Sequence, residues 1–380
     1  MKAWPLLGIL FVQTFLCLAH WFLYVTWMHS GWPMSAAAAL ALRVTLTALS
    51  FCFVPAALIG FRFYGGLVAL VYRLSSVWMG LLNFLFWSAC LFWFVDFVLR
   101  LAPGDTHLRT RPIIAAALLA VSLLATLYGL VNAARIRTRM VSVRLPGLPA
   151  SWRSRRAVLV SDLHLGNING LRFAHRVAHR VRALAPEIVF LPGDLFDGTR
   201  VDPATIAAPI LALAPPLGLY FVTGNHEVFG GSERFTEPLR RGGIRVMDNA
   251  RADVEGVDIL GISYKDSTHP IRLRQFLAAQ QLDPARPSIL LQHVPNRLPI
   301  VEQCGVSLQL SGHTHGGQIF PFTWITRRAF GLFMHGLHRF GNLQVYTSTG
   351  VGTWGPPLRV GSASEIVLLT FEQPLTQPGG

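Results

Sequence analysis

The chain changes character near residue 140, and this boundary constrains its architecture more than any other feature. Before it, long apolar runs dominate and the acidic residues are limited to Asp96 and Asp105. Over the whole chain, 52% of residues are hydrophobic and only 14% are charged, whereas soluble domains carry about 25% charge. The composition excludes a disordered chain and argues against a purely soluble one. It predicts a membrane region in residues 1–140, followed by a separate folded domain in residues 145–372.

Four apolar segments in the first part are long enough to cross a bilayer, which requires about 20 residues. We expect these transmembrane helices at residues 4–27, 36–59, 75–99 and 113–132. The first segment lacks a convincing small-residue cleavage site and three further spans follow it, so we interpret it as retained and not as a signal peptide. Asp96 precedes Arg100 by four residues, which favours a helical ion pair, whereas the more central Arg43 has no assigned role.

The formal net charge of +14 comes almost entirely from arginine and suits either anionic partners or the anchoring of membrane helices. An even number of spans puts both chain ends on one side, and the positive-inside rule selects that side. The terminal side carries Lys2, Arg62, Arg73, Arg135, Arg137, Arg139 and Arg144, against Arg100, Arg109 and Arg111 on the other. This bias predicts a multi-pass membrane protein with its C-terminal domain in the cytoplasm.

The second part alternates short β-rich runs with helical segments, which predicts an α/β domain with a largely buried sheet. Strand composition is found at residues 157–160, 188–191, 219–222, 258–262, 288–291, 306–310, 343–346 and 366–370. Helices are expected at residues 171–184 and 203–213. The tail, residues 373–380, is rich in Pro, Gly and Gln and is expected to be frayed.

Polar residues that can bind a metal follow five of these strands directly, and the ends of strands are where sites form in α/β sheets. The candidate ligands are Asp162, His164, Asp194, Asn225, His293, His313 and His315. Nitrogen and oxygen donors without thiolate suit Mn, Fe, Zn, Co or Ni, but not Ca²⁺. Seven ligands are too many for one tetrahedral ion, and they predict two ions that share a bridging carboxylate.

The ordered motifs D-x-H, G-D-x-x-D-G, G-N-H-E, H-x-P and G-H-T-H-G-G resemble those of the calcineurin-like metallophosphoesterase superfamily. The run GHTHGGQ and the later STGVGTWGPPLR resemble its YkuE/YaeI-like branch, in which a membrane-anchored front end also occurs. The resemblance covers residues 155–371. It implies a four-layer α-β-β-α sandwich of two mixed sheets and a metal-dependent phosphoric ester hydrolase.

The resemblance also implies a role for each residue. Asp162, His164 and His315 would bind one divalent ion, and Asn225, His293 and His313 the other, with Asp194 bridging both. His226 would contact the phosphate and act in catalysis together with Asp194, and a hydroxide bridging the ions would attack phosphorus. Asp197 and Glu227 are interpreted as a turn residue and a hydrogen-bond partner near the site, not as ligands.

The expected substrate is a phosphodiester or pyrophosphate, and the membrane region favours one that is part of a lipid or a nucleotide-linked lipid. Residues 318–340 mix large apolar side chains with Arg327, Arg328 and Arg339, which is typical of a rim resting on a membrane. An ordinary packed insertion explains this segment equally well. The alternatives for the whole chain are a membrane receptor that binds a phosphorylated ligand without hydrolysis, and a nuclease. The nuclease is disfavoured, since no long basic groove with stacking aromatics is apparent.

Overall fold

The computed structural model describes residues 4–101 and 103–373, so the predicted frayed tail lies outside the described residues apart from Gln373. The chain forms two compact units. Among the described residues, the first comprises 4–101, 103–131 and Gly355–Leu358, and the second comprises Asn132–Trp354 with 359–373. Each unit is described separately below.

The first unit consists of long apolar helices. They are α1 (Trp4–His29), α2 (Ala36–Ser50), α3 (Phe53–Arg62), α4 (Gly66–Arg100) and α5 (Thr106–Ala134). Four helical stretches, with α2 and α3 counted as one, are long and apolar enough to cross a membrane, as the sequence predicted. Phe11 and Leu67 are among the many apolar side chains on their surfaces that stay exposed, which suits lipid contact.

The second predicted span is not a single helix. Its helical hydrogen bonding is interrupted at Phe51 and Cys52, where α2 ends and α3 begins. Pro55 lies in the first turn of α3, the one region of a helix where the missing proline N–H costs no hydrogen bond. Proline therefore explains why the chain restarts a helix at this place.

Buried charges join three of these helices at one end. The predicted pair is present, with Arg100 Nη2 at 2.7 Å from Asp96 Oδ2. Arg111 Nε approaches the other oxygen, Oδ1, to 2.6 Å, and His29 Nε2 lies 3.1 Å from Oδ2. Asp96 is only 2% exposed, so this carboxylate links α1, α4 and α5 from inside the bundle.

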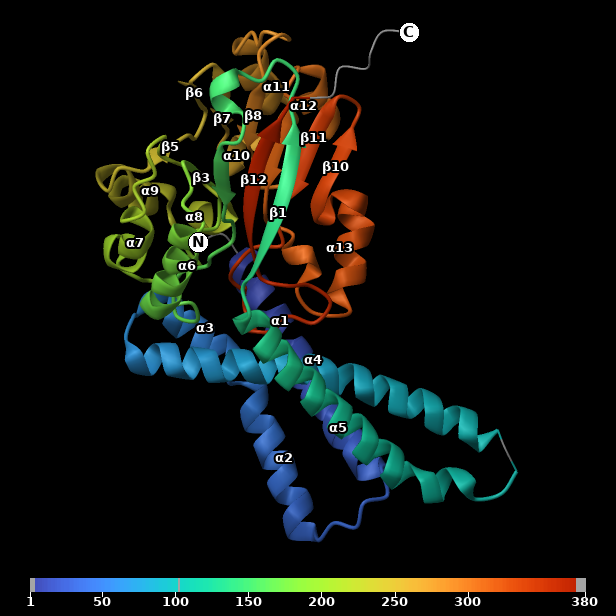
Figure 1. Cartoon of the computed structure of the whole chain (residues 1–380). Helices are drawn as coiled ribbons and strands as arrows, with labels where there is room; N and C mark the ends of the chain where they lie inside the picture. Colours follow the sequence, from blue (N-terminus) through green and yellow to red (C-terminus); the bar gives the residue numbers. More distant parts are fainter. Residues whose placement is uncertain (1–3, 102, 374–380) are drawn as a thin grey trace. The chain divides into compact units, whose positions relative to one another are not determined.

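The second unit is built on two six-stranded mixed sheets (Figure 1). The first has the order β1 (Arg137–Arg144), β12 (Glu365–Glu372), β2 (Arg156–Leu159), β3 (Ile188–Pro192), β4 (Leu219–Val222) and β5 (Arg245–Val246). The second has the order β10 (Gly336–Phe340), β11 (Leu343–Thr347), β9 (Leu308–Ser311), β8 (Ser288–Leu291), β7 (Val257–Gly261) and β6 (Ala250–Val254). Within the described part of the chain, most neighbouring strands are parallel in both sheets; the first sheet contains one antiparallel pair, β12 with β2, and the second contains two, β10 with β11 and β6 with β7.

Alternating side chains of the strands fill two different cores. In β3, Ile188 and Phe190 join the apolar cluster shared by the two sheets, whereas Val189 and Leu191 face the cluster containing α6 and α7. This period of two is the strand pattern expected when both faces of a sheet are covered. Burying each such side chain contributes roughly 1.5–3 kcal/mol, so the strands are rigid supports for whatever follows them.

Helices cover the outer face of each sheet, which gives the four layers that the sequence predicted. The helices α6 (Leu171–Ala183), α7 (Pro203–Leu211) and α9 (Ser232–Arg241) pack on the first sheet. The second sheet is covered by α11 (Pro270–Ala279) and α12 (Leu298–Gln303). The shorter elements are η1 (Ala150–Trp152), α8 (Asn225–Gly230), α10 (Tyr264–Ser267), η2 (His315–Gly317), α13 (Phe322–Phe330) and η3 (Gly331–Met334).

Candidate metal centre

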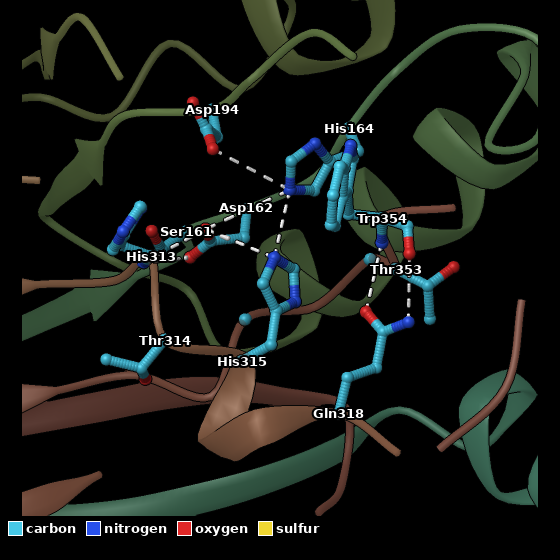
Figure 2. A network of polar contacts seen from close by, with 12 residues as sticks. Ser161, Asp162, His164, Asp194, His313, Thr314, His315, Gln318, Thr353 and Trp354 are labelled. Atoms are coloured by element: carbon cyan, nitrogen blue, oxygen red, sulfur yellow. Dashed lines mark hydrogen bonds and ion pairs between the residues drawn. The ribbon is translucent and has the colours of Figure 1, made fainter. Parts of the chain in front are cut away.

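The predicted site residues come from loops that directly follow parallel strands of both sheets. Asp162 and His164 follow β2, Asp194 follows β3, Asn225 and His226 follow β4, His293 follows β8, and His313 and His315 follow β9. Because parallel strands end at the same edge of a sheet, these loops converge. Figure 2 shows Asp162, His164, Asp194 and His315 directed toward one another.

One group of donors consists of Asp162, His164 and His315, whose ligand atoms all lie within 4.8 Å of one another. The Nε2 atoms of His164 and His315 are 3.0 Å apart, and His315 Nε2 lies 3.5 Å from Asp162 Oδ1 (Figure 2). All three side chains are buried. They are the residues assigned to one ion by the resemblance.

A second group consists of Asp194, His293 and His313. His293 Nε2 lies 3.2 Å from Asp194 Oδ2. Asn225 Oδ1 lies 3.2 Å from His293 Nε2 and 3.0 Å from His313 Nδ1, so the amide oxygen lies among the ligand atoms of this group. Asp194 also lies 3.8 Å from His164 Nε2, and it therefore stands between the two groups, as a bridging carboxylate would.

The chemistry of the donors fits divalent metal ions. The two facing imidazole nitrogens of His164 and His315 are buried at 3.0 Å, a distance at which a hydrogen bond needs one of them to carry a proton. A cation between such nitrogens and the adjacent carboxylates would satisfy all of these lone pairs at once. Nitrogen and oxygen donors without sulfur suit first-row transition ions and zinc.

The backbone is strained at these residues. Asp162, His164, Asp194, His313 and His315 have φ values of 54°, 48°, 51°, 71° and 49°. Non-glycine residues rarely adopt such positive φ, and each one costs about 1–3 kcal/mol. The strained turns redirect the chain immediately after the strands. The surrounding packed sheets must hold them in place.

Burial and mutual charge shift the pKa values of the donors in opposite directions. Burial alone would raise the pKa of Asp194, but the positive charges of His293 and His226 hold it well below its usual range. Burial disfavours the charged form of His293, yet the Asp194 carboxylate raises its pKa to about 9. Burial lowers the pKa of His313 to about 4 and that of His164 and His315 well below the usual value. Three of the four histidines are therefore neutral and ready to bind a metal at pH 7.

Glu227 and Asp197 support the site without joining a donor group. Glu227 is fully buried and accepts hydrogen bonds from the backbone N–H of Asp194 at 3.1 Å, Phe196 at 2.9 Å and Gly224 at 2.8 Å. The side chain of Asp197 accepts from the N–H and hydroxyl of Thr199, as a turn residue does. Both roles agree with the sequence interpretation, and the structure supplies the partners.

His226 forms a third donor group with His164 and Asp194, and a backbone carbonyl orients its ring. Its Nδ1 donates to the Asp197 carbonyl oxygen at 2.8 Å, so the proton on that ring is fixed at Nδ1 and Nε2 is left for the site. The backbone N–H of His226 donates to Asp194 Oδ1 at 3.0 Å. His226 is half-buried, unlike the fully buried His164 and His293. It is therefore accessible to a molecule that approaches the centre.

Arg359 supports the site, although no role was predicted for it from the sequence. The side chain is fully buried, and Nη2 donates to the carbonyls of Thr349 at 2.7 Å and Gly352 at 2.6 Å. Nη1 donates to the His315 carbonyl at 3.2 Å. Burial lowers the pKa of Arg359 to about 10, which still leaves the guanidinium charged at pH 7. The position of Arg359 directly after the apolar run Gly355–Leu358 is the sequence feature that could have indicated a buried arginine.

Known proteins resemble this chain over most of its length. The calcineurin-like phosphoesterase family model matches residues 155–317. A transmembrane protein with metallophosphoesterase domain from Danio rerio is 34% identical over 289 residues, which cover 72% of this chain and, just under two thirds, 64% of that protein. The metallophosphoesterase Cj0846 of Campylobacter jejuni is 30% identical over 324 residues, or 80% of this chain and 86% of that protein. The metallophosphoesterase YkuE of Bacillus subtilis is 26% identical over 253 residues, or 62% and 86%.

These similarities agree with the motifs, the two mixed sheets and the clustered donors. The match to Cj0846 extends beyond the family model and over most of both chains. The Danio rerio relative is named as a transmembrane protein, which agrees with the four candidate membrane spans of this chain. The chain therefore belongs to the calcineurin-like metallophosphoesterase family, and it carries four helical stretches long and apolar enough to cross a membrane.

Proposed function

We propose that this chain hydrolyses a phosphodiester or pyrophosphate at a centre of two divalent ions, and that its substrate is a membrane lipid or a nucleotide-linked lipid. The observation that supports the reaction best is that Asp194 belongs to two donor groups, one with His293 and His313 and one with His164 and the half-buried His226. Asp162, His164 and His315 would hold one ion, and Asn225, His293 and His313 the other. When bound, such ions lower the pKa of a water molecule and stabilise charge on phosphoryl oxygens.

The residues of the chain divide the remaining work. In its doubly protonated imidazolium form, His226 would donate from Nε2 to a phosphoryl oxygen or give that proton to the departing alkoxide, while Nδ1–H stays on the Asp197 carbonyl. The buried side chains of Asp162, His164 and His293 exclude water from one side of the centre. The half-buried Asn225, His226 and His313 leave the other side open to substrate. No covalent bond to the protein is required for this reaction.

Two observations support a lipid substrate. Four candidate spans hold the chain in a bilayer, where lipid phosphates are concentrated. The helix α13 presents Phe322, Trp324 and Ile325, which are 52%, 67% and 63% exposed, beside the exposed Arg327 and Arg328. Aromatic and basic side chains on one short helix are typical of contact with an anionic membrane surface. The arginine bias in the sequence supports a cytoplasmic position for the domain in a bacterial inner membrane.

The test is hydrolysis by the full chain in detergent after removal of metals with a chelator. Adding back Mn²⁺ should restore cleavage of bis(p-nitrophenyl) phosphate, with slower cleavage of p-nitrophenyl phosphate, and Asp194→Ala should remain inactive. His226→Ala should keep its metal but lose about 100-fold or more in kcat. A receptor that only binds its ligand would bind metal and show no turnover on soluble or lipid esters, and that result would reject the proposal.

A further inference from the structure

The open side of the metal centre is bordered by aromatic rings. Among the predicted site residues, His226 and His313 are half-buried and mark this side. The ring of Trp354 lies 5.9 Å from that of His226, and the ring of Phe330 lies 6.2 Å from that of His313. We call the set formed by these rings together with Tyr264 and Phe229 the aromatic collar.

Tyr264 and Phe229 continue the collar beside the second donor group. The Tyr264 ring is 6.2 Å from that of His293, and Phe229 follows at 6.4 Å from Tyr264. Phe229 is 76% exposed and lies one turn after Asn225 in α8. The rings therefore flank both donor groups and not one of them alone.

Trp354 is exposed although its backbone is fixed. Its side chain is 60% exposed. The buried amide of Gln318 accepts from the Trp354 N–H at 3.0 Å and donates to its carbonyl at 2.9 Å (Figure 2). A mobile loop would explain an exposed tryptophan without any function, but this two-point clamp argues against that explanation. A large apolar surface held in place beside a catalytic histidine keeps its contact area available for a ligand.

We infer that the aromatic collar, and Trp354 above all, binds the apolar substituent of the phosphoester and sets the specificity of the centre. Phe229, Phe330 and the face of the Trp354 indole offer no hydrogen-bonding groups, so they favour an alkyl chain or an aryl ring over a sugar hydroxyl. The inference rests on the proposed function, since the substituent is recognised while its phosphate lies at the metal centre.

The experiment compares methyl, butyl and phenyl p-nitrophenyl phosphate, which share one leaving group and differ in the substituent that stays on phosphorus. With the full chain in detergent, kcat/KM should be at least about tenfold higher for the butyl ester than for the methyl ester. Trp354→Ala should lower this ratio about fivefold or more through KM, and Trp354→Phe should restore part of it. The phenyl ester shows whether a flat ring or a chain is preferred.

The control is Met140→Ala, which removes an apolar side chain that is 75% exposed on β1, a strand without metal-site residues. Its ratio should equal that of the wild type. An unchanged ratio in Trp354→Ala, or an equal loss in Met140→Ala, would overturn the inference. Calorimetric binding of butylphosphonate against methylphosphonate separates this failure from failure of the proposed function. A protein without turnover that still prefers butylphosphonate through Trp354 would support the collar and reject the hydrolysis.

Discussion

At the scale of single residues, His293 is the donor whose protonation must change most when a metal binds. Its pKa is raised to about 9 by Asp194, so His293 carries a proton at pH 7 in the metal-free protein. His313, with a pKa of about 4, and Asp162, with a pKa of about 6, are already in their metal-binding forms at that pH. Metal binding must therefore expel the proton from His293.

This predicts release of about one proton per centre at pH 7, measured by calorimetry in buffers of different ionisation enthalpy. The affinity for Mn²⁺ should rise about tenfold per pH unit from pH 7 and level off near pH 9, because above the pKa of His293 no proton remains to be displaced. In His293→Ala the release should be smaller by about one proton. An affinity that does not change between pH 7 and 9 in the wild type would contradict the assignment.

Glu227 is predicted to hold the loops that carry Asp194 and Asn225. Glu227→Ala would leave three backbone N–H groups buried without an acceptor, which costs about 3 kcal/mol or more in the free energy of unfolding. Metal affinity should fall about 10- to 100-fold, since the donors lose their support. Thermal unfolding and metal content measure the two effects.

The matched control for Glu227 is Glu233→Ala, because the Glu233 side chain is 84% exposed. It should change neither the unfolding temperature nor the metal content. If Glu227→Ala behaved like this control, the hydrogen bonds to the backbone would have no supporting role.

The sequence predicted which candidate donors lie close together, but not their backbone geometry. Asp162, His164, Asp194, His313 and His315 were recognised because each follows a strand in a specific motif. Their positive φ values were not predictable, since aspartate and histidine adopt this region only when tertiary packing holds them there. The same holds for Arg359 and Trp354, which lie in a motif noted in the sequence. Their partners, His315 and Gln318, are 44 and 36 residues away along the chain.

At the scale of secondary-structure elements, the sequence predicted apolar strands and missed polar ones. The strand β4 has the predicted bounds, because four buried β-formers in a row leave little choice. The strand β1 was interpreted only as positive charge following the last span. It pairs in parallel with β12 along Arg137–Arg144, and most of its side chains are exposed, as is typical of an edge strand. Its three arginines drew attention to charge, so its potential to form a strand was not recognised.

The membrane helices yield a prediction at the same scale, because Asp96 connects α1, α4 and α5. Asp96→Asn would leave the guanidinium groups of Arg100 and Arg111 without their carboxylate, one of them only 13% exposed. Breaking a buried ion pair from one side costs about 3–5 kcal/mol. Thermal unfolding in detergent should therefore occur at a clearly lower temperature, whereas Asp105→Asn, at an exposed position, should behave as the wild type. Equal unfolding temperatures for both variants would exclude a stabilising role for the cluster.

At the scale of the whole molecule, the chain combines an apolar first unit with a metallophosphoesterase domain and a net charge of +14. The four long apolar helices were predictable from hydrophobic length, whereas the four-layer fold was implied by the resemblance of the ordered motifs. The substrate was not predictable, because it depends on how side chains distant in sequence surround the open side of the centre. The exposed aromatic residues found there favour an apolar phosphoester.

The central claim is that seven residues hold two metal ions on one bridging carboxylate, and elemental analysis of the reloaded full chain tests it most directly. After removal of metals, incubation with Mn²⁺ and desalting, the wild type should retain about two ions per chain and hydrolyse the diester. Asp194→Ala should retain about one or fewer and show no hydrolysis, since both ions lose a shared ligand. A wild-type protein that is fully active with a single ion, or an Asp194→Ala variant that keeps both, would contradict the account.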